Sequence, residues 1–395
     1  MRSVELFAGA GGLALGCELA GFESQLVVEW DRWACDTMRQ NKANGYPLVA
    51  NWNVHEGDVR AVDWSNLVGT DVDLVAGGPP CQPFSMGGKH GAYDDARDMF
   101  PAATEVIRTL RPRAFLLENV KGLTRSAFAN YFSYIQFRLS MPEVMRRADE
   151  LWTDHLARLQ AEHTSTADSG LTYRVIPTLV NAADYGVPQQ RHRVFLVGIR
   201  CDIDAEFRFP KPTHTREALL KSQASGEYWD RHRVASSKRP IRSFPRGLFE
   251  VRGKPWRTVR DALVGLPEPS SRAARTALNH VQQPGARSYP GHTGSPVDEP
   301  AKTLKAGDHG VPGGENMLRD LDGSVRYFTV RESARLQTFP ERYELHGSWT
   351  EAMRQLGNAV PVLLAEKVAK SVAAHLAAAE VRRIQSEAVS RRVTA

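Results

Sequence analysis

A cysteine in a proline-rich turn is the residue of this chain with the clearest capacity for chemistry. Cys81 stands in the run Gly77-Gly78-Pro79-Pro80-Cys81-Gln82-Pro83-Phe84-Ser85, directly after the apolar stretch 73–76. Three prolines stiffen this turn, so we expect the thiol to be exposed. Nearby cations lower the pKa of a thiol, and the thiolate is a strong nucleophile near neutral pH. The pattern favours a catalytic nucleophile over the small buried hydrophobe that a lone cysteine usually is.

Charged side chains that could assist a nucleophile occur at the end of one apolar run and just before another. Glu118, in Leu117-Glu118-Asn119-Val120, comes at the end of a predicted strand, where a partly buried acid can hold or donate a proton. In the run 189–193, Gln-Gln-Arg-His-Arg, strand alternation points Arg191 and Arg193 to one face. Beside a nucleophile these arginines would stabilise anionic character, whereas elsewhere they would be ordinary surface charges.

A glycine-rich turn near the start of the chain has the composition of a nucleoside site. The run 7–12, Phe-Ala-Gly-Ala-Gly-Gly, joins an apolar stretch to a helical one, and glycines there let a ligand approach the main chain. Glu29, eighteen residues after Gly11, can accept hydrogen bonds from ribose hydroxyls, and Trp30 can stack on a purine. The run 57–59, Gly-Asp-Val, offers a carboxylate to a base edge. These residues alone fit NAD, S-adenosylmethionine or a purely structural turn.

The elements that must position these residues alternate between strand and helix. Strands are predicted at 4–7, 26–29, 73–76, 114–117, 173–180 and 193–199, and helices at 13–20, 33–41, 103–110, 329–336 and from 361 onward. This alternation predicts an α/β fold with a parallel sheet covered on both faces. Ser140 and Glu143 have capping-box spacing, which predicts that a further helix begins there.

Composition indicates a folded chain without a membrane span. Of 395 residues, 42% are hydrophobic and 24% are charged, and no stretch approaches the ~18 apolar residues that a span needs. The first residues lack the apolar stretch of a signal peptide. Four scattered cysteines argue against a disulfide framework or a CxxC metal site, so we expect a cytoplasmic protein.

The positive charge is concentrated in one region. The chain has a net charge of +6, but residues 231–287 alone hold 13 Lys and Arg against three acids, a net of +10. The rest of the chain therefore sums to −4. A basic block within a mildly acidic protein is typical of a protein that binds a polyanion.

Eight blocks of the sequence resemble, in order, the DNA (cytosine-5) methyltransferases of the bacterial modification type. They are 5–12, 29–31, 57–59, 78–85, 118–120, 189–193, 331–337 (Arg-Glu-Ser-Ala-Arg-Leu-Gln) and 357–361 (Gly-Asn-Ala-Val-Pro). A single glycine turn would be a weak signal. Eight blocks in family order, including Pro80-Cys81-Gln82, are a specific one.

The resemblance implies a role for each catalytic candidate. Cys81 would attack C6 of the target cytosine, and Glu118 would hydrogen-bond N3 and the exocyclic amino group. Arg193 would contact O2 of the base, and Arg191 would support the cysteine loop. The methyl group would pass from S-adenosylmethionine to C5 of a cytosine swung out of the duplex. No metal would be required.

The resemblance also implies which residues line the cofactor site. They are Phe7, Ala10, Gly11, Gly12, Glu29, Trp30, Asp58, Val59, Pro80, Asn358, Ala359 and Val360. The last three would return from the C-terminal part of the chain to close the site. We therefore expect S-adenosylmethionine as the cofactor.

The implied architecture is a Rossmann-like S-adenosylmethionine-dependent methyltransferase sheet with a smaller, loop-rich domain. Residues 1–200 would form the catalytic domain, 201–325 the target-recognition domain, and 326–395 a return segment with a basic tail. We expect a monomer that acts on double-stranded DNA, with a cognate restriction endonuclease as a possible partner. Two alternatives are a tRNA cytosine-5 methyltransferase, whose Cys-Phe-Thr tripeptide is absent here, and a silent DNA-binding subunit, which the intact Cys81 and Glu118 disfavour.

Overall fold

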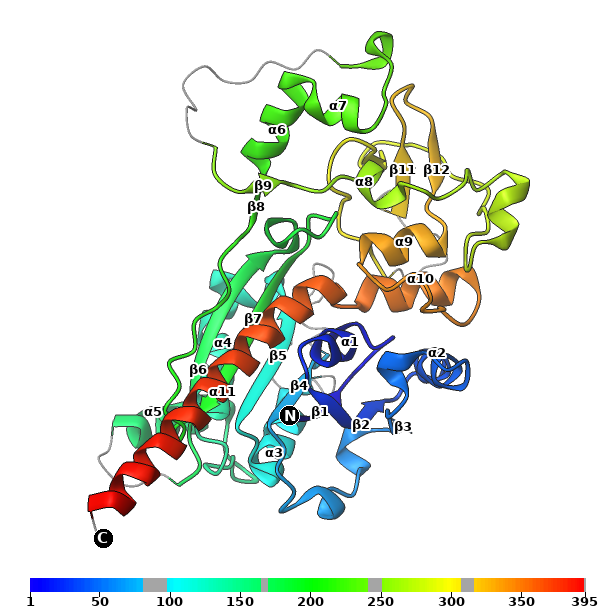
Figure 1. The fold of residues 1–395 in the computed structure, drawn as a ribbon. Helices are drawn as coiled ribbons and strands as arrows, with labels where there is room; N and C mark the ends of the chain where they lie inside the picture. Colours follow the sequence, from blue (N-terminus) through cyan, green and yellow to red (C-terminus); the bar gives the residue numbers. More distant parts are fainter. Residues whose placement is uncertain (81–97, 165–169, 241–250, 307–315, 394–395) are drawn as a thin grey trace.

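A seven-stranded sheet forms the centre of the larger part of the molecule (Figure 1). A computed structural model describes residues 1–80, 98–164, 170–240, 251–306 and 316–393. The strands of the sheet are β1 Arg2–Leu6, β2 Glu23–Glu29, β3 Val54–Glu56, β4 Leu74–Gly77, β5 Ala114–Val120, β6 Tyr173–Asn181 and β7 His192–Arg200. Their spatial order is β3-β2-β1-β4-β5-β7-β6. The predicted α/β fold is confirmed.

The direction of β7 differs from the parallel sheet that the sequence predicts. β7 pairs antiparallel with both β5 and β6, while β1 to β5 are parallel to one another. Residues 182–191 link β6 to β7, and this link is too short for the crossover that a parallel neighbour needs. The first residues of β7 therefore lie at the edge where the parallel strands end.

Helices cover both faces of the sheet. Their bounds are α1 Gly12–Leu19, α2 Arg32–Ala43, α3 Phe100–Leu110, α4 Ala129–Ser140, α5 Trp152–Thr164, α9 Val330–Leu336, α10 Trp349–Asn358 and α11 Val362–Val393. Strand residues alternate between two apolar layers, so that Val75 packs with α3, α4 and α5, and Ala76 packs with α1 and α11. Helix α11 crosses the molecule diagonally and lies against α1 (Figure 1).

The segment after α4 contradicts the helix predicted to begin at Ser140. Helix α4 ends at Ser140, and α5 begins only at Trp152. The carboxylate of Glu143 accepts a hydrogen bond of 2.9 Å from the backbone N–H of Leu171 and forms an ion pair of 3.0 Å with Arg111. These distant partners occupy the carboxylate that a capping box would have used.

A smaller domain follows β7 and lies beyond one edge of the sheet (Figure 1). Its elements are β8 His214–Thr215, α6 Arg216–Ser225, α7 Glu227–Arg231, β9 Lys254–Pro255, α8 Val259–Leu263, β10 Ser295–Pro296, β11 Met317–Arg319 and β12 Val325–Tyr327. One of its apolar clusters joins Val259, Leu304 and Leu318 to Phe328 and Leu336. Helix α9 therefore shares a core with this domain. Among the described residues, no helix combines the length and apolar character of a membrane span.

Candidate active site

Five parallel strands bring predicted site residues to one edge of the sheet. These residues are Phe7 after β1, Trp30 after β2, Asp58 after β3, Pro80 after β4 and Glu118 within β5. Because β7 is antiparallel, Arg193 at its second position reaches the same edge, opposite Val120 of β5. Ligands of open α/β sheets bind outside this edge.

The turn between β1 and α1 has the backbone conformation that its glycines predict. Gly9 and Gly11 have φ angles of 55° and 83°, and Phe7 before them also has a positive φ of 54°. A Cβ added at Gly9 would meet no atom within 4 Å, so the turn has open space in front of it. The buried hydroxyl of Tyr343 donates a hydrogen bond of 2.9 Å to the carbonyl of Ala10 from behind. The turn therefore has free space beside Gly9, and the hydrogen bond from Tyr343 fixes its backbone at Ala10.

Glu29 at the end of β2 is fixed by the backbone around it. Its carboxylate accepts hydrogen bonds from the N–H groups of Gly9 (2.7 Å), Trp30 (2.9 Å) and Asp31 (2.8 Å). Burial raises the pKa of this carboxyl group, and the three hydrogen bonds oppose that shift. Only one of them reaches Oε2, so that oxygen keeps acceptor capacity for a ligand.

The residues predicted to surround a base lie beside Glu29. The Trp30 side chain is 76% exposed and presents its ring to solvent. Asp58 caps a short turn and forms an ion pair of 2.5 Å with Arg60. Val59 next to it is buried in the apolar layer of α3 and α4. Trp30 and Asp58 are therefore accessible to a ligand, whereas the buried Val59 side chain packs in the core and does not face the ligand side.

The return segment packs directly on the glycine turn. A Cβ added at Gly12 would lie 2.4 Å from the carbonyl oxygen of Val360, so only glycine permits this approach. Ala359 and Val360 are buried, and Asn358 is exposed at the end of α10. The structure thus brings residues 358–360 to the turn at residues 9–12.

A buried carboxylate–guanidinium pair occupies the centre of this edge. The Oε1 atom of Glu118 lies 2.6 Å from Nε of Arg193, and both residues are less than 10% exposed. Burial raises the pKa of the Glu118 carboxyl group, and the charges of Arg193 and Arg191 oppose the shift. Such a carboxyl group can hold a proton closer to neutral pH than a surface glutamate does.

Arg191, two residues before Arg193, is fully buried. Its guanidinium donates hydrogen bonds to the carbonyl oxygens of Leu304 (3.2 Å) and Gly357 (2.7 Å). These contacts tie the start of β7 to the smaller domain and to the end of α10. The predicted contact with the cysteine loop falls on residues 81–97, which lie outside the described part of the chain.

Cys81 itself lies outside the described residues, but the backbone that leads to it is well placed. The side-chain amide of Asn119 donates a hydrogen bond of 3.0 Å to the carbonyl of Pro79. The N–H of Met99 donates to the carbonyl of Pro80 at 3.3 Å. A Cβ added at Gly78 would lie 3.5 Å from Oε2 of Glu118. The chain therefore enters the cysteine turn beside the Glu118 carboxylate.

Two buried glutamines at this edge were not predicted as site residues. Gln189 and Gln337 are fully buried, and Nε2 of Gln189 donates to Oε1 of Gln337 at 3.2 Å. Both belong to sequence blocks that carry the resemblance. Their contacts join segments more than 100 residues apart, so periodicity along the chain could not reveal them.

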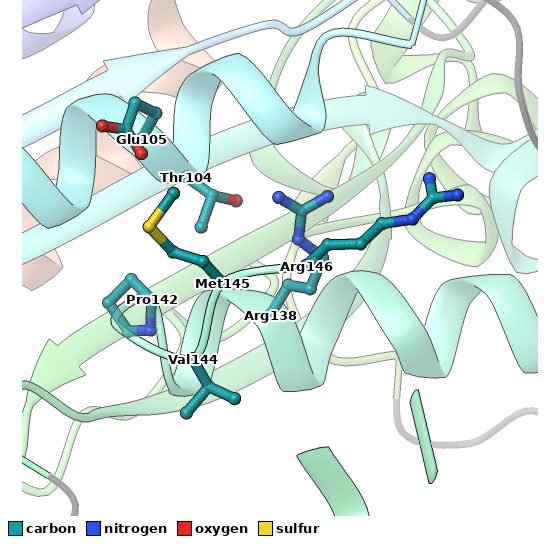
Figure 2. Close-up of a pocket in the computed structure, with 7 residues that line it drawn as sticks. All are labelled: Thr104, Glu105, Arg138, Pro142, Val144, Met145 and Arg146. Carbon is teal, nitrogen blue, oxygen red and sulfur yellow. The ribbon is translucent and has the colours of Figure 1, made fainter. Parts of the chain in front are cut away.

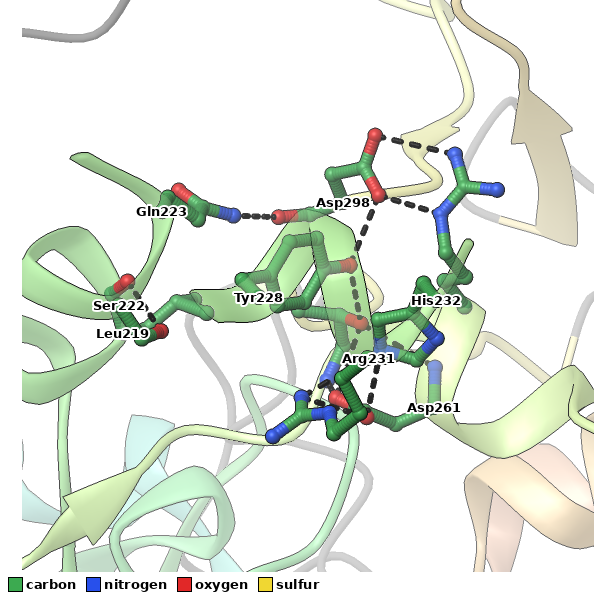
Figure 3. A network of polar contacts seen from close by, with 10 residues as sticks. Leu219, Ser222, Gln223, Tyr228, Arg231, His232, Asp261 and Asp298 are labelled. Carbon is green, nitrogen blue, oxygen red and sulfur yellow. Dashed lines mark hydrogen bonds and ion pairs between the residues drawn. The ribbon is translucent and has the colours of Figure 1, made fainter. Parts of the chain in front are cut away.

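The smaller domain contains a network of polar contacts around Tyr228, Asp261 and Asp298 (Figure 3). The hydroxyl of Tyr228 donates to Asp298 at 2.7 Å, and Arg260 forms an ion pair of 2.6 Å with the same carboxylate. Asp261 accepts from His232 at 3.0 Å. Within residues 231–240 and 251–287, the exposed cations are Arg231, Arg233, Lys238, Arg252, Lys254, Arg257, Arg272, Arg275 and Arg287.

Figure 2 shows a pocket lined by residues of α3, α4 and the segment after α4. Its seven lining residues, Thr104, Glu105, Arg138, Pro142, Val144, Met145 and Arg146, include no predicted site residue. Buried residues of α4 and α5, such as Tyr134 and Leu159, pack into the main core, so this region completes a layer of the fold. No group of metal-ligating side chains occurs in the described parts of the chain.

The strand order, the glycine turn and the acid at the end of β2 define an α/β fold of the kind whose ligands bind at the carboxyl ends of the parallel strands. Residues 1–140 and 158–374 match the profile of the C-5 cytosine-specific DNA methylase family. The type II methyltransferase M.PspPI of Psychrobacter sp. (strain TA137) is 34% identical over 95% of this chain and 80% of its own length. M.NgoMIV of Neisseria gonorrhoeae is 32% identical over 94% of this chain and 96% of its own length.

A solved structure has the same fold at lower identity. The S. pombe Dnmt2 methyltransferase superposes with a TM-score of 0.53 at 17% identity, covering 95% of this chain and 98% of that one. The chain belongs to the C-5 cytosine-specific DNA methylase family and is a DNA (cytosine-5) methyltransferase. The family resemblance predicted from the sequence is confirmed.

Proposed function

We propose that this methyltransferase takes its methyl group from S-adenosylmethionine and acts through a covalent bond between Cys81 and C6 of an everted cytosine. The observation that carries the proposal is the buried Glu118–Arg193 pair, 2.6 Å apart, beside the backbone that leads into the Pro80-Cys81 turn. This arrangement supports a site where a nucleophile and a pyrimidine edge meet.

The residues around the glycine turn fit an adenine nucleoside. Oε2 of Glu29 can accept from a ribose hydroxyl, and the exposed ring of Trp30 can stack on the adenine. Asp58 can receive the base edge, and the space before Gly9 admits a ligand to the main chain. The methionine part would lie along the turn at Phe7, Ala10 and Gly12, closed by residues 358–360. When bound, S-adenosylmethionine supplies a methyl group activated by its sulfonium.

The catalytic side chains would act in sequence on the cytosine ring. The Cys81 thiolate forms a bond to C6, which makes C5 electron-rich. Glu118, whose pKa burial raises, holds a proton at N3 and accepts a hydrogen bond from the exocyclic amino group. Arg193 donates to O2, and Arg191 keeps the start of β7 in place through its two carbonyl contacts. C5 would then bond the methyl group, which would leave the cofactor as the neutral thioether S-adenosylhomocysteine. Loss of the C5 proton to a solvent water and release of the Cys81 thiolate would restore the aromatic ring.

The smaller domain would hold the duplex and read its sequence. Its exposed cations suit phosphate contacts, which would offset the few kcal/mol that turning a base out of the stack costs. We propose that residues 201–325 form this target-recognition domain and that the enzyme acts as a monomer in the cytoplasm. The type II methyltransferases among its relatives support a modification role beside a restriction endonuclease of the same specificity.

Bisulfite sequencing of DNA from cells that express the chain tests this function. We expect one short sequence context to become methylated, and the Cys81→Ala variant to leave every cytosine unmodified. A plasmid carrying that context should also become resistant to an endonuclease that cuts it. Unmodified cytosines with the wild-type chain would overturn the assignment, and parallel sequencing of tRNA would reveal an RNA substrate.

A duplex with 5-fluorocytosine at the methylated position tests the covalent step. Fluorine cannot leave C5 as a cation, so the wild-type enzyme should remain attached to the duplex in a denaturing gel when S-adenosylmethionine is present. The Cys81→Ser variant should form no such adduct. An adduct in that variant would show that another residue is the nucleophile.

A further inference from the structure

The smaller domain touches the cofactor turn through a continuous stack of three backbone segments. Segment 301–306 of the smaller domain pairs with Gln189, just before β7. A Cβ added at Gly357 would lie 2.3 Å from the backbone nitrogen of Ala306, so this segment rests on the end of α10. Val360 in turn rests on Gly12, as described above. A displacement of segment 301–306 would therefore displace residues 357–360, which in turn contact the glycine turn.

Two buried glutamines, Gln189 and Gln337, connect these three backbone segments by hydrogen bonds. Gln189 accepts from the N–H of Leu304 at 3.0 Å through Oε1, and its Nε2 donates to Gln337. Nε2 of Gln337 donates to the carbonyl oxygens of Leu356 and Ala359, the latter at 3.3 Å. Each side chain thus uses its amide oxygen and both amide hydrogens, since Gln189 also donates to Leu336 at 3.4 Å.

A satisfied amide pair in a dry interior has few alternative arrangements. Without these partners, the buried N–H of Leu304 and the carbonyl of Leu356 would be left unpaired, which an interior tolerates poorly. The pair therefore sets the position of segment 301–306 relative to residues 356–359, while Arg191 bridges the same two segments at Leu304 and Gly357.

We propose that Gln189 and Gln337 are positioning residues that couple DNA binding in the smaller domain to cofactor binding at the glycine turn. The inference rests on the proposed function, because it takes DNA to lie against the smaller domain and S-adenosylmethionine against the turn. DNA bound against segment 301–306 would hold it in this position and so hold residues 357–360 against Gly12, and the bound cofactor would do the reverse. Linkage requires the two effects to be equal.

The coupling is measured with a labelled duplex that carries the sequence methylated in cells. The dissociation constant of the duplex is determined without and with saturating S-adenosylhomocysteine, and that of S-adenosylhomocysteine without and with duplex. In the wild type, each ligand should tighten the other by the same factor, at least about fivefold. In Gln337→Met and Gln189→Met this factor should fall below about twofold, while each ligand alone binds within about threefold of wild type.

The matched control is Gln355→Met. Gln355 is also buried, but its side chain joins Thr37 of α2 to the carbonyl of His346, away from the stack. It should keep the wild-type coupling at a comparable melting temperature. Wild-type coupling in both stack variants, or none in an active wild-type enzyme, overturns the inference. Failure of the wild type to methylate DNA would instead strike the proposed function.

Discussion

The pKa of the Glu118 carboxyl group is set by two opposing effects of its surroundings. Burial raises its pKa, whereas Arg193 at 2.6 Å and Arg191 favour the ionised form. A group poised in this way can hydrogen-bond a pyrimidine in either protonation state. The two arginines therefore adjust the acidity of the group as well as positioning it.

Replacing Glu118 tests whether this proton matters. Glu118→Gln keeps the shape and hydrogen-bonding ability of the side chain but cannot transfer a proton. We expect methyl transfer to a defined duplex to fall by about 10² to 10⁴, with DNA affinity nearly unchanged. Glu105→Gln, at an exposed ion pair with Arg108, is the control and should keep full activity. Wild-type turnover in Glu118→Gln would remove Glu118 from the mechanism.

Glu5 is a second buried carboxyl group, beneath the glycine turn in β1. Burial raises its pKa to about 8, the Cys17 thiol beside it opposes the shift, and Glu18 adds to it. The unfolded chain loses this proton near pH 4.5, whereas the folded protein keeps it to about pH 8. The free energy of unfolding therefore falls as the pH rises between these values, by at most about 1.4 kcal/mol per pH unit.

Glu5→Gln should remove this dependence, because the amide stays neutral. We expect the variant to gain stability relative to wild type between pH 5.5 and 8, and to show little further gain above pH 8. Urea unfolding at several pH values measures the difference. Parallel stability curves for the two proteins would show that the wild-type carboxyl group is already ionised in the folded state.

At the scale of elements, the close contact of α1 with α11 depends on one glycine. A Cβ added at Gly16 would lie 2.3 Å from Cβ of Ala365 and 2.6 Å from the backbone nitrogen of Glu366. Gly16→Ala should therefore destabilise the protein by about 1–3 kcal/mol, despite the better helix propensity of alanine. Chemical denaturation measures the loss. Ala365→Gly added to it should recover part of the stability, and no recovery would place the strain elsewhere.

The sequence predicted six of the seven strands of the large sheet, and helices α1, α2, α3, α9 and α11, because their apolar residues repeat locally. It failed where distant partners decide. Ser140 and Glu143 have the spacing of a capping box, yet Glu143 binds Leu171 and Arg111. Ser348 and Glu351 have the same spacing, and there Ser348 does cap a helix, α10, which was not predicted. The same local signal thus has two outcomes, and tertiary contacts select between them.

The same limit applies to the site. Strand ends and glycines predicted that Glu29 and Glu118 reach one edge, and the structure places them there. Arg193 reaches that edge because β7 runs antiparallel to β5, which the sequence did not predict. The links of Gln189 to Leu304 and Gln337 connect residues 115 and 148 positions apart, and no periodic pattern encodes them. The sequence therefore predicted the residues with reactive or charged side chains, but not the glutamines that connect the segments around them.

At the scale of the whole molecule, charge is divided between the two domains. Several exposed arginines and lysines of the smaller domain face solvent, while buried carboxylates such as Asp298 pair with Arg260 in its interior. If about half of the nine exposed cations described within residues 231–287 contact phosphates, the logarithm of the DNA association constant should fall with the logarithm of salt with a slope of roughly −4. Fluorescence anisotropy over a salt series measures this slope, and a value near zero would contradict phosphate binding.

The packing of α11 on α1 has a consequence for synthesis. Helix α1 leaves the ribosome early, yet its partner and the residues that close on Gly12 are made some 350 positions later. At about 5–20 residues per second, the first helix waits tens of seconds for its cover. A nascent chain therefore lacks the residues that pack on the glycine turn until most of its length has been made.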